Sequence, residues 1–231
     1  MGADPDVIAQ IRRTLDVLFK PGDVVELRIL DAPKGGVISG YYNDFGKLAL
    51  DAAQWDGRAP GIYVCLNPCW LELLDRSPNH FKTHCKHGDL TKDRDVFSRR
   101  WLPVDFDPVR PADTSSTDAE HYAAIARARV TRSSLAVTEG WPEAIVADSG
   151  NGAHLLYRVD FPNDGPSKER IRAALVMIKE RFSTETVKID TSVSNAARIW
   201  RLFGTMNCKG TNTPERPHRR SCILDLPLEN P

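Results

Sequence analysis

The sequence has no excess charge of either sign, because 31 Lys and Arg residues balance 31 Asp and Glu residues over 231 positions. A polyanion could therefore be bound only by a local basic patch. No apolar run reaches the length of a membrane span and the N-terminus has no signal-peptide pattern, so we expect no membrane association. The five cysteines are odd in number and scattered, which argues against a disulfide-built secreted domain and favours the cytoplasm.

Glycine-rich phosphate loops of the P-loop or protein-kinase type are also absent, as are internal repeats and low-complexity tracts. This absence argues against an ordinary ATPase or kinase. The composition is that of a globular chain, 41% hydrophobic and 27% charged. Its length suffices for one large domain or two packed halves.

The spacing of apolar residues predicts helices and strands in both halves of the chain. Up to residue 100 we expect helices over about 6–20 and 47–55, and strands over 24–30, 37–42 and 61–66. Beyond it we expect strands over 101–108, 144–148, 155–161 and 187–190, and helices beginning at Thr117 and Ser167. Residues 194–202 are expected to form a short helix or an extended turn.

The helix after Thr117 has the clearest start signal. Thr117 and Glu120 form a capping box, in which each side chain satisfies a backbone N–H of the first turn. The expected buried face carries the residues Tyr122, Ile125, Ala126 and Val130.

An apolar run over 101–108 reaches two aspartates one residue apart, Asp105 and Asp107. In a strand these side chains share one face, with Cα atoms roughly 7 Å apart, while Val104 and Phe106 point into a core. Two carboxylates on one face repel each other unless a positive charge lies between them, and divalent metal ions prefer oxygen ligands. The alternative for so short a motif is a strand that ends in a turn-forming Asp-Pro.

The expected hairpin turn carries a second motif, Ser149-Gly150-Asn151-Gly152-Ala153-His154. Glycines permit positive φ, so consecutive backbone N–H groups can converge into an anion-binding nest. Ser149 and His154 flank this nest as side-chain donors, and a phosphate chain would suit it. The alternative is a plain hairpin with a solvent-exposed histidine.

A third carboxylate, Asp190, ends the strand 187–190, and Arg198, Arg201 and Lys209 follow it. For the cations alone, a surface salt-bridge cluster is the alternative. Together with the two earlier motifs they suit a metal-bound nucleoside triphosphate. Three carboxylates can hold two divalent ions, and the cations and turn can bind the phosphate tail.

The segment 77–100 is polar and contains His80, His84, Cys85 and His87, with Cys65 and Cys69 upstream. Their spacing fits no standard zinc pattern, and a cysteine in an apolar strand is usually a small hydrophobe, so zinc is the less favoured alternative. We expect a solvated loop whose basic residues could contact nucleic acid. The candidate nucleic-acid-binding residues are Lys92, Arg99 and Arg100.

The three motifs resemble those of the archaeo-eukaryotic primase (AEP) superfamily, and most closely its primase-polymerases from plasmids, phages and CRISPR-associated loci. The likeness is carried by Asp-Phe-Asp at 105–107, Ser-Gly-Asn-Gly-Ala-His at 149–154 and Ile-Asp-Thr-Ser-Val-Ser-Asn-Ala-Ala-Arg-Ile-Trp-Arg-Leu-Phe-Gly-Thr at 189–205. Their order and spacing match the family, and the likeness runs from about Gly61 to Lys209.

The resemblance implies an α+β fold, with an RRM-like antiparallel-sheet catalytic core beside a smaller N-terminal α/β subdomain. We expect one catalytic domain over 1–231, divided into the subdomain at 1–100, the core at 101–215 and a tail at 216–231. The implied metal ligands and catalytic residues are Asp105, Asp107 and Asp190. The candidate nucleotide-binding residues are Ser149, Gly150, Asn151, Gly152, His154, Arg198, Arg201 and Lys209.

The implied activity is DNA primase-polymerase activity: template-directed nucleotidyl transfer from dNTPs or NTPs with two Mg²⁺ or Mn²⁺ ions. The implied partners are single-stranded DNA template, primer and nucleotide, with a helicase or other replication or CRISPR adaptation proteins as further possibilities. Two alternatives stay open. One is a metal-dependent sugar-nucleotide transferase, in which Asp-x-Asp also occurs, and the other is a non-catalytic nucleic-acid-binding replication module.

Overall fold

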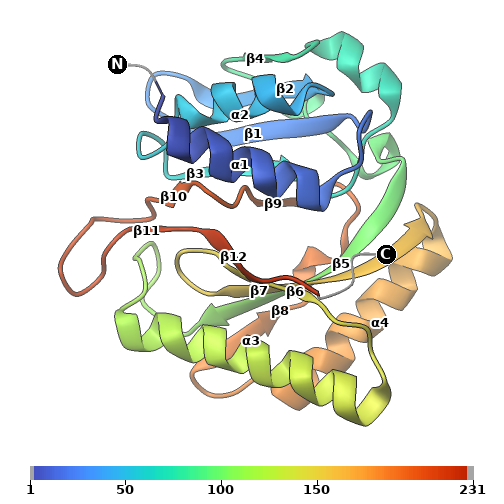
Figure 1. The fold of residues 1–231 in the computed structure, drawn as a ribbon, viewed down its shortest axis with the longest axis vertical. Helices are drawn as coiled ribbons and strands as arrows, with labels where there is room; N and C mark the ends of the chain where they lie inside the picture. Colours follow the sequence, from blue (N-terminus) through green and yellow to red (C-terminus); the bar gives the residue numbers. More distant parts are fainter. Residues whose placement is uncertain (1–2, 228–231) are drawn as a thin grey trace.

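The computed structural model describes residues 3–227 and contains two five-stranded sheets, which lie one above the other in Figure 1. The helices are α1 (Pro5–Leu18), α2 (Phe45–Ala53), α3 (Asp118–Glu139) and α4 (Gly165–Phe182). The strands are β1 (Val25–Ala32), β2 (Gly36–Tyr42), β3 (Gly61–Cys65), β4 (His80–Lys82), β5 (Ser98–Pro108), β6 (Ile145–Asp148), β7 (Ala153–Pro162), β8 (Val187–Asp190), β9 (Ile199–Arg201), β10 (Met206–Asn207), β11 (Arg219–Arg220) and β12 (Cys222–Asp225). Within the described range, no helix has the length and apolar character needed to span a bilayer.

The second sheet has the strand order β12-β6-β7-β5-β8, with antiparallel pairing throughout. From β5 to β8 the chain runs strand, helix, strand, strand, helix, strand, so β5 and β7 are central. This is the RRM-like arrangement, and the α+β fold class is confirmed. Helices α3 and α4 cover the lower face of the sheet in Figure 1, where Val104, Phe106 and Leu155 are buried. The opposite face of β5 is directed toward the first sheet.

The first sheet has the order β4-β2-β1-β3-β9 and is packed by α1 and α2. Its last strand comes from far along the chain, because β9 pairs with β3 through Tyr63 opposite Arg201 and Val64 opposite Trp200. The expectation of a helix or extended turn over 194–202 is therefore wrong for its second half. The expected subdomain boundary at residue 100 also needs correction, since residues 199–201 complete the first sheet.

The expected helices are present, with differences at their starts and faces. The Thr117–Glu120 capping box of α3 is formed as expected. The start of α4 lies earlier than expected, because Asp164 and not Ser167 is its N-cap. Tyr122 and Val130, expected to face inward, are 66% and 55% exposed. The buried stripe of α3 consists largely of small residues, such as Ala124, Ala128 and Thr131, so hydrophobicity alone misplaces its face.

The residues after 215 do not form a tail within the described range. β11 pairs with β10 in a short hairpin, and β12 joins the edge of the second sheet beside β6. Figure 1 shows this last segment returning along the upper side of the second sheet. The C-terminal segment is therefore part of the fold that shapes the space between the sheets.

Candidate functional site

The second sheet places the predicted acidic residues on one face. Asp105 on β5 lies directly opposite Asp190 on β8 and opposite His154 on β7. Asp107 follows two residues along β5, so its side chain is on the same face, and its partner on β8 is Lys188. Three strands thus present a row of Asp190, Asp105 and His154, with Asp107 beside it.

Each carboxylate in this group has a nitrogen-bearing neighbour, which is an arginine for Asp107 and Asp190 and a histidine for Asp105. Asp105 Oδ1 lies 3.4 Å from His154 Nε2, Asp107 Oδ1 lies 3.4 Å from Arg110 Nη1, and Asp190 Oδ2 lies 3.3 Å from Arg198 Nη2. Asp190 also accepts hydrogen bonds of 2.8 Å from the backbone N–H and the hydroxyl of Ser192. Between residues 3 and 227, no three His, Cys, Asp or Glu side chains are gathered closely enough to form a ready metal site.

The surroundings of Asp107 shift the pKa of its carboxyl group upward. Desolvation in the cleft raises its pKa, the neighbouring charge of Asp105 raises it further, and Arg110 opposes both effects. Burial and the adjacent charge of Asp105 therefore both disfavour the ionised form of Asp107. A hard cation bound near Asp105 and Asp107 would relieve this repulsion.

A cleft of about 360 Å³ lies over Asp105, Asp107 and His154, while Asp190, opposite Asp105 on β8, is not among its lining residues. Its lining residues are Leu30, Tyr63, Asp105, Asp107, Arg110, Ser149, Asn151, His154, Arg198, Ile199, Trp200, Arg201, Asn207 and Lys209. The first sheet and the second sheet each contribute to this lining, so the cleft lies between them. Of the predicted nucleotide-binding residues, the structure brings Ser149, Asn151, His154, Arg198, Arg201 and Lys209 together here.

Several buried polar atoms at this cleft have no hydrogen-bond partner. They are Asn151 Nδ2, His154 Nδ1, Trp200 Nε1 and Arg201 Nη1, four of the eight such side-chain atoms found between residues 3 and 227. All four residues line the cleft and are at most 7% exposed. Three of these atoms are hydrogen-bond donors, and His154 Nδ1 is a donor or an acceptor according to the tautomer of the ring. Buried donors without partners are unfavourable, so the cleft favours a ligand rich in acceptor oxygens.

Aromatic side chains hold the basic residues of the cleft in place. The ring of His154 lies 4.2 Å from Trp200 and 5.7 Å from Phe203, centroid to centroid. The Arg201 guanidinium lies 4.5 Å from the centroid of the Tyr63 ring, and its Nη2 donates to Tyr63 Oη at 3.1 Å. Burial lowers the pKa of Arg201 from its ordinary value. The β9–β3 pairing therefore holds Arg201, whose guanidinium has a donor without a hydrogen-bond partner, in the upper wall of the cleft.

The glycine turn has a different role from the one expected. Gly150 N–H donates to Asp148 Oδ1 at 2.6 Å and Gly152 N–H donates to Ser149 Oγ at 2.9 Å, so neither is free for an anion. The expected backbone nest is therefore wrong. A Cβ on Gly152 would overlap the carbonyl oxygen of Phe106, which shows that this glycine allows β5 to approach closely. The turn instead directs the side chains of Ser149 and Asn151 to the cleft.

The expected basic strip outside the cleft is not formed. Arg99 and Arg100 are 3% and 4% exposed, because β5 begins at Ser98 and carries both into the interior. The Arg100 guanidinium is paired with Asp23, and Arg99 Nη1 donates to the carbonyl oxygen of Ser194 at 2.9 Å. Burial also lowers the pKa of Arg99. These two arginines stabilise contacts between distant segments of the fold. Lys92 is half-buried, so the three residues do not form an exposed surface for nucleic acid.

Sequence reasoning missed several residues of the site. Arg110 lies three positions after Asp107, a spacing that could have identified it. Tyr63 and Leu30 come from the first sheet, where no motif marks them. Behind the glycine turn, buried His121 lies 2.9 Å from Asp148, the residue that accepts from Gly150. That pair supports the turn without lining the cleft.

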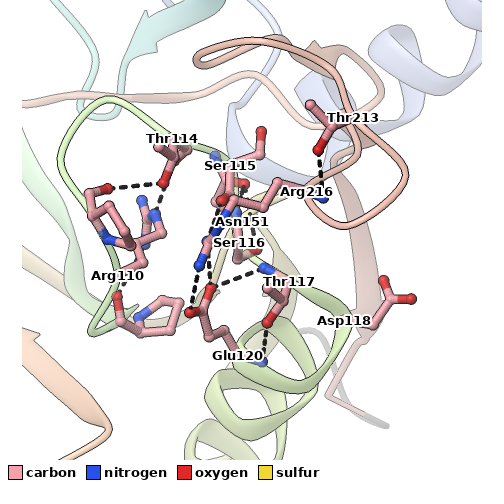
Figure 2. Close-up of polar contacts among 12 residues, drawn as sticks. Arg110, Thr114, Ser115, Ser116, Thr117, Asp118, Glu120, Asn151, Thr213 and Arg216 are labelled. Atoms are coloured by element: carbon pink, nitrogen blue, oxygen red, sulfur yellow. Dashed lines mark hydrogen bonds and ion pairs between the residues drawn. The ribbon is translucent and has the colours of Figure 1, made fainter.

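The rim of the cleft is built from two loops, 109–117 and 208–218, which Figure 2 shows in contact. Arg216 Nη1 donates to Glu120 Oε2 and to the carbonyl oxygen of Ser115, both at 2.7 Å. Asn151 Oδ1 accepts from the backbone N–H of Ser116 at 3.0 Å, and Ser115 Oγ donates to the carbonyl oxygen of Lys209 at 2.8 Å. These contacts join the start of α3, the glycine turn and the C-terminal loop.

The Arg216–Glu120 pair gives the rim a predictable dependence on pH. The hydrogen bonds from Arg216, aided by those from Thr117, hold the pKa of Glu120 below its ordinary value of 4.5. A carboxylate with a lowered pKa contributes stability that is present above its unfolded-state pKa and is lost as pH falls through its folded-state pKa. Arg216→Met should therefore lower the unfolding temperature at pH 7, and the difference from the parent should shrink below pH 4.5.

Thermal unfolding of both proteins from about pH 3 to about pH 7 measures this difference. This range spans the titration of a glutamate carboxyl group. Arg172→Met is the matched control, because the Arg172–Glu169 pair lies on the exposed surface of α4. An exposed pair of this kind contributes little to stability. A difference for Arg216→Met that is the same at both ends of the pH range would contradict the assignment.

No protein-family model matches the sequence, and no curated protein matches it. The fold is nevertheless that of an AEP primase-polymerase domain. The AEP domain of the cyanophage S-2L primase-polymerase superposes with a TM-score of 0.53 over 97% of this chain and 91% of that one, at 13% identity. At this identity the likeness concerns the fold, and it confirms the expected AEP architecture.

Two further solved structures are similar at lower scores. The primase RepB′ gives a TM-score of 0.47 at 11% identity, over 95% of this chain and 56% of that one. The polymerase domain of Mycobacterium tuberculosis ligase D, in complex with DNA, gives 0.48 at 14% identity, over 93% and 79%.

Proposed function

We propose that the protein is a nucleotidyltransferase of the primase-polymerase kind, which adds nucleotides to a growing strand under the direction of a DNA template. The observation that carries this proposal is the row of Asp190, Asp105 and His154 across three adjacent strands, with Asp107 beside it. Asp105, Asp107 and His154 line the floor of a cleft whose walls carry Arg198, Arg201 and Lys209. Acids below and cations above suit a metal-bound nucleoside triphosphate.

The donor set fits a divalent metal ion such as Mg²⁺ or Mn²⁺. Asp105, Asp107 and Asp190 offer hard oxygen ligands from one sheet face, and burial together with the neighbouring charge of Asp105 raises the pKa of Asp107 there. These three residues would hold the metal, after exchanging their contacts with His154, Arg110 and Arg198. When bound, the metal supplies positive charge that neutralises the phosphate oxygens and favours the attacking oxygen in its ionised form.

The protein's own residues bind and orient the nucleotide. Arg201 has a donor without a partner and lies in the upper wall, where a guanidinium can bind two phosphate oxygens at once. His154, Asn151 and Trp200 offer further unpartnered nitrogens around the same space. The close packing of His154 against Trp200 holds these groups in place before the nucleotide arrives, which lowers the cost of ordering them.

The reaction that this arrangement supports is an in-line phosphoryl transfer. The 3′-hydroxyl oxygen of the growing strand bonds to the α-phosphorus of the nucleotide, and the bond between the α-phosphorus and the bridging oxygen of the β-phosphate breaks. Pyrophosphate leaves, and the hydroxyl proton is released to solvent. Arg198 and Arg201 stabilise the charge on the leaving pyrophosphate.

Extension of a labelled primer on a DNA template, with Mg²⁺ or Mn²⁺ and either dNTPs or NTPs, tests the proposal directly. We expect products that follow the template sequence and disappear when the metal is chelated. Incubation with UDP-sugars in place of the nucleotides tests the sugar-nucleotide transferase alternative. Binding of primer–template without any extension under these conditions would overturn the proposal and favour a non-catalytic nucleic-acid-binding module.

A further inference from the structure

A second hollow, of about 240 Å³, adjoins the cleft beyond Asp107. Asp107, Arg110 and Lys209 line both spaces, so the two are adjacent. Tyr63 and Arg201 line only the cleft, whereas Lys188 lines only the second hollow. Asp107 therefore lies between the cleft, which Arg201 lines, and the second hollow, which Lys188 lines.

The second hollow carries more positive than negative side chains. Lys188 and Lys209 are exposed cations, Arg110 is a third cation, and the acids are Asp107 and Asp113. Lys188 is opposite Asp107 in the β5–β8 register, so its side chain rises from the same sheet face as the acidic row. The strand pairing thus sets a cation directly beside the site of the reaction. No element of the proposed nucleotide-binding site uses it.

The opposite wall of the hollow is held firmly. Arg110 Nε donates to the carbonyl oxygen of Thr114 at 3.2 Å and its Nη1 donates to that of Pro108 at 3.2 Å, which folds loop 109–117 around the guanidinium. Thr114 Oγ1 in turn donates to the carbonyl oxygen of Pro111 at 2.8 Å. Lys209 is anchored through its backbone, which accepts from Ser115 Oγ and donates to Asn207 Oδ1. These hydrogen bonds fix the shape of the hollow.

We propose that this hollow binds a backbone phosphate of the growing strand, close to its 3′ end, and that Lys188 is its principal contact. The inference rests on the proposed function and adds the position of the second substrate. In an in-line transfer the attacking hydroxyl must approach the α-phosphorus from the side opposite the leaving pyrophosphate. Because Arg201 marks the pyrophosphate side of Asp107, the attacking strand enters from the side of Lys188.

Equilibrium binding of a fluorescent primer–template, measured by anisotropy without nucleotide at several salt concentrations, tests Lys188 without any need for turnover. Loss of one phosphate contact lowers the slope of log affinity against log salt by about 0.7 to 0.9. Lys188→Ala should therefore weaken binding roughly fivefold to eightfold at 0.1 M salt. Lys179→Ala is the matched control, because Lys179 is an exposed lysine on α4, on the other face of the same sheet.

A primer with a neutral methylphosphonate at its last internucleotide linkage identifies the phosphate. For the parent protein this substitution should cost the same affinity as Lys188→Ala, and the two changes together should cost no more than either alone. Additive losses, or a coupling found only with a methylphosphonate in the template strand, would overturn the assignment. So would a Lys188→Ala protein that binds DNA normally or that changes only the KM for the nucleotide. Because binding is measured without turnover, an inactive parent protein would count against the proposed function and leave this test intact.

Discussion

Asp105→Asn should reduce the rate of nucleotide addition by about three orders of magnitude, which corresponds to about 4 kcal/mol of lost transition-state stabilisation. Asp105 is the centre of the acidic row, with Asp190 opposite it on one side and His154 on the other. Asparagine keeps the shape of the side chain but removes one charged oxygen ligand, and charge stabilisation of the phosphoryl group depends on such ligands. Single-turnover primer extension at saturating nucleotide measures the effect.

The same substitution should leave the fold intact and ease the repulsion in the row. Asp105 raises the pKa of Asp107, so the pKa of Asp107 should fall in the variant. Asp75→Asn serves as the control for charge removal, because Asp75 is exposed on the surface of the first half of the chain. Circular dichroism and thermal unfolding verify that both variants are folded. A folded Asp105→Asn protein with near-parental turnover would disprove the assignment of the acidic row.

Arg201→Ala should weaken nucleotide binding roughly tenfold to a hundredfold, since a lost charge-assisted hydrogen bond is worth about 1.5–3 kcal/mol. Its effect should appear in the KM for nucleotide and in the Kd measured without turnover, while kcat changes less, because the contact exists already in the ground-state complex. Titration of the protein with a non-hydrolysable nucleotide, alongside steady-state extension, separates the two quantities. Arg201→Lys should restore little, since an ammonium group lacks the planar fork of the guanidinium.

Arg158→Ala is a close control for Arg201→Ala. Arg158 also lies over an aromatic ring, 5.3 Å from the centroid of Trp101, but it does not line the cleft. Loss of Arg201 removes a buried cation that has an unpartnered donor, but it also removes the contacts of this side chain with Tyr63, so thermal unfolding must verify that the variant is folded. Equal nucleotide affinity in the Arg201→Ala protein and the parent would contradict the binding role.

The parts of the fold that could be predicted are those that short stretches of sequence determine. The alternation of polar and apolar residues through Val104, Asp105, Phe106 and Asp107 is enough to predict a strand and the face on which the acids lie. The capping box at Thr117 marks the start of α3 in the same local way. The likeness of three motifs to one family predicted the α+β architecture, which the strand order of the second sheet confirms.

The parts that could not be predicted depend on contacts between distant segments. Ile199–Arg201 becomes a strand only because β3 offers an unpaired edge, and nothing within those three residues signals this. Arg99 and Arg100 look like surface cations until Asp23 and Ser194 are brought beside them. The N–H groups of Gly150 and Gly152 look available for an anion until Asp148 and Ser149 satisfy them. In each case the partner, and not the residue itself, decides the outcome.

The crossing of β9 into the first sheet has a consequence for how the chain folds. β9 follows Asp190, the end of β8 in the second sheet, by only eight intervening residues, so the two sheets share one continuous stretch of chain. The first hundred residues alone would leave the edge of β3 open, and open edges promote pairing between molecules. Because the closing strand comes late in the chain, contacts of long sequence separation must form before either sheet is complete, which slows folding. Unfolding of either sheet should accordingly carry the other with it, as one cooperative transition.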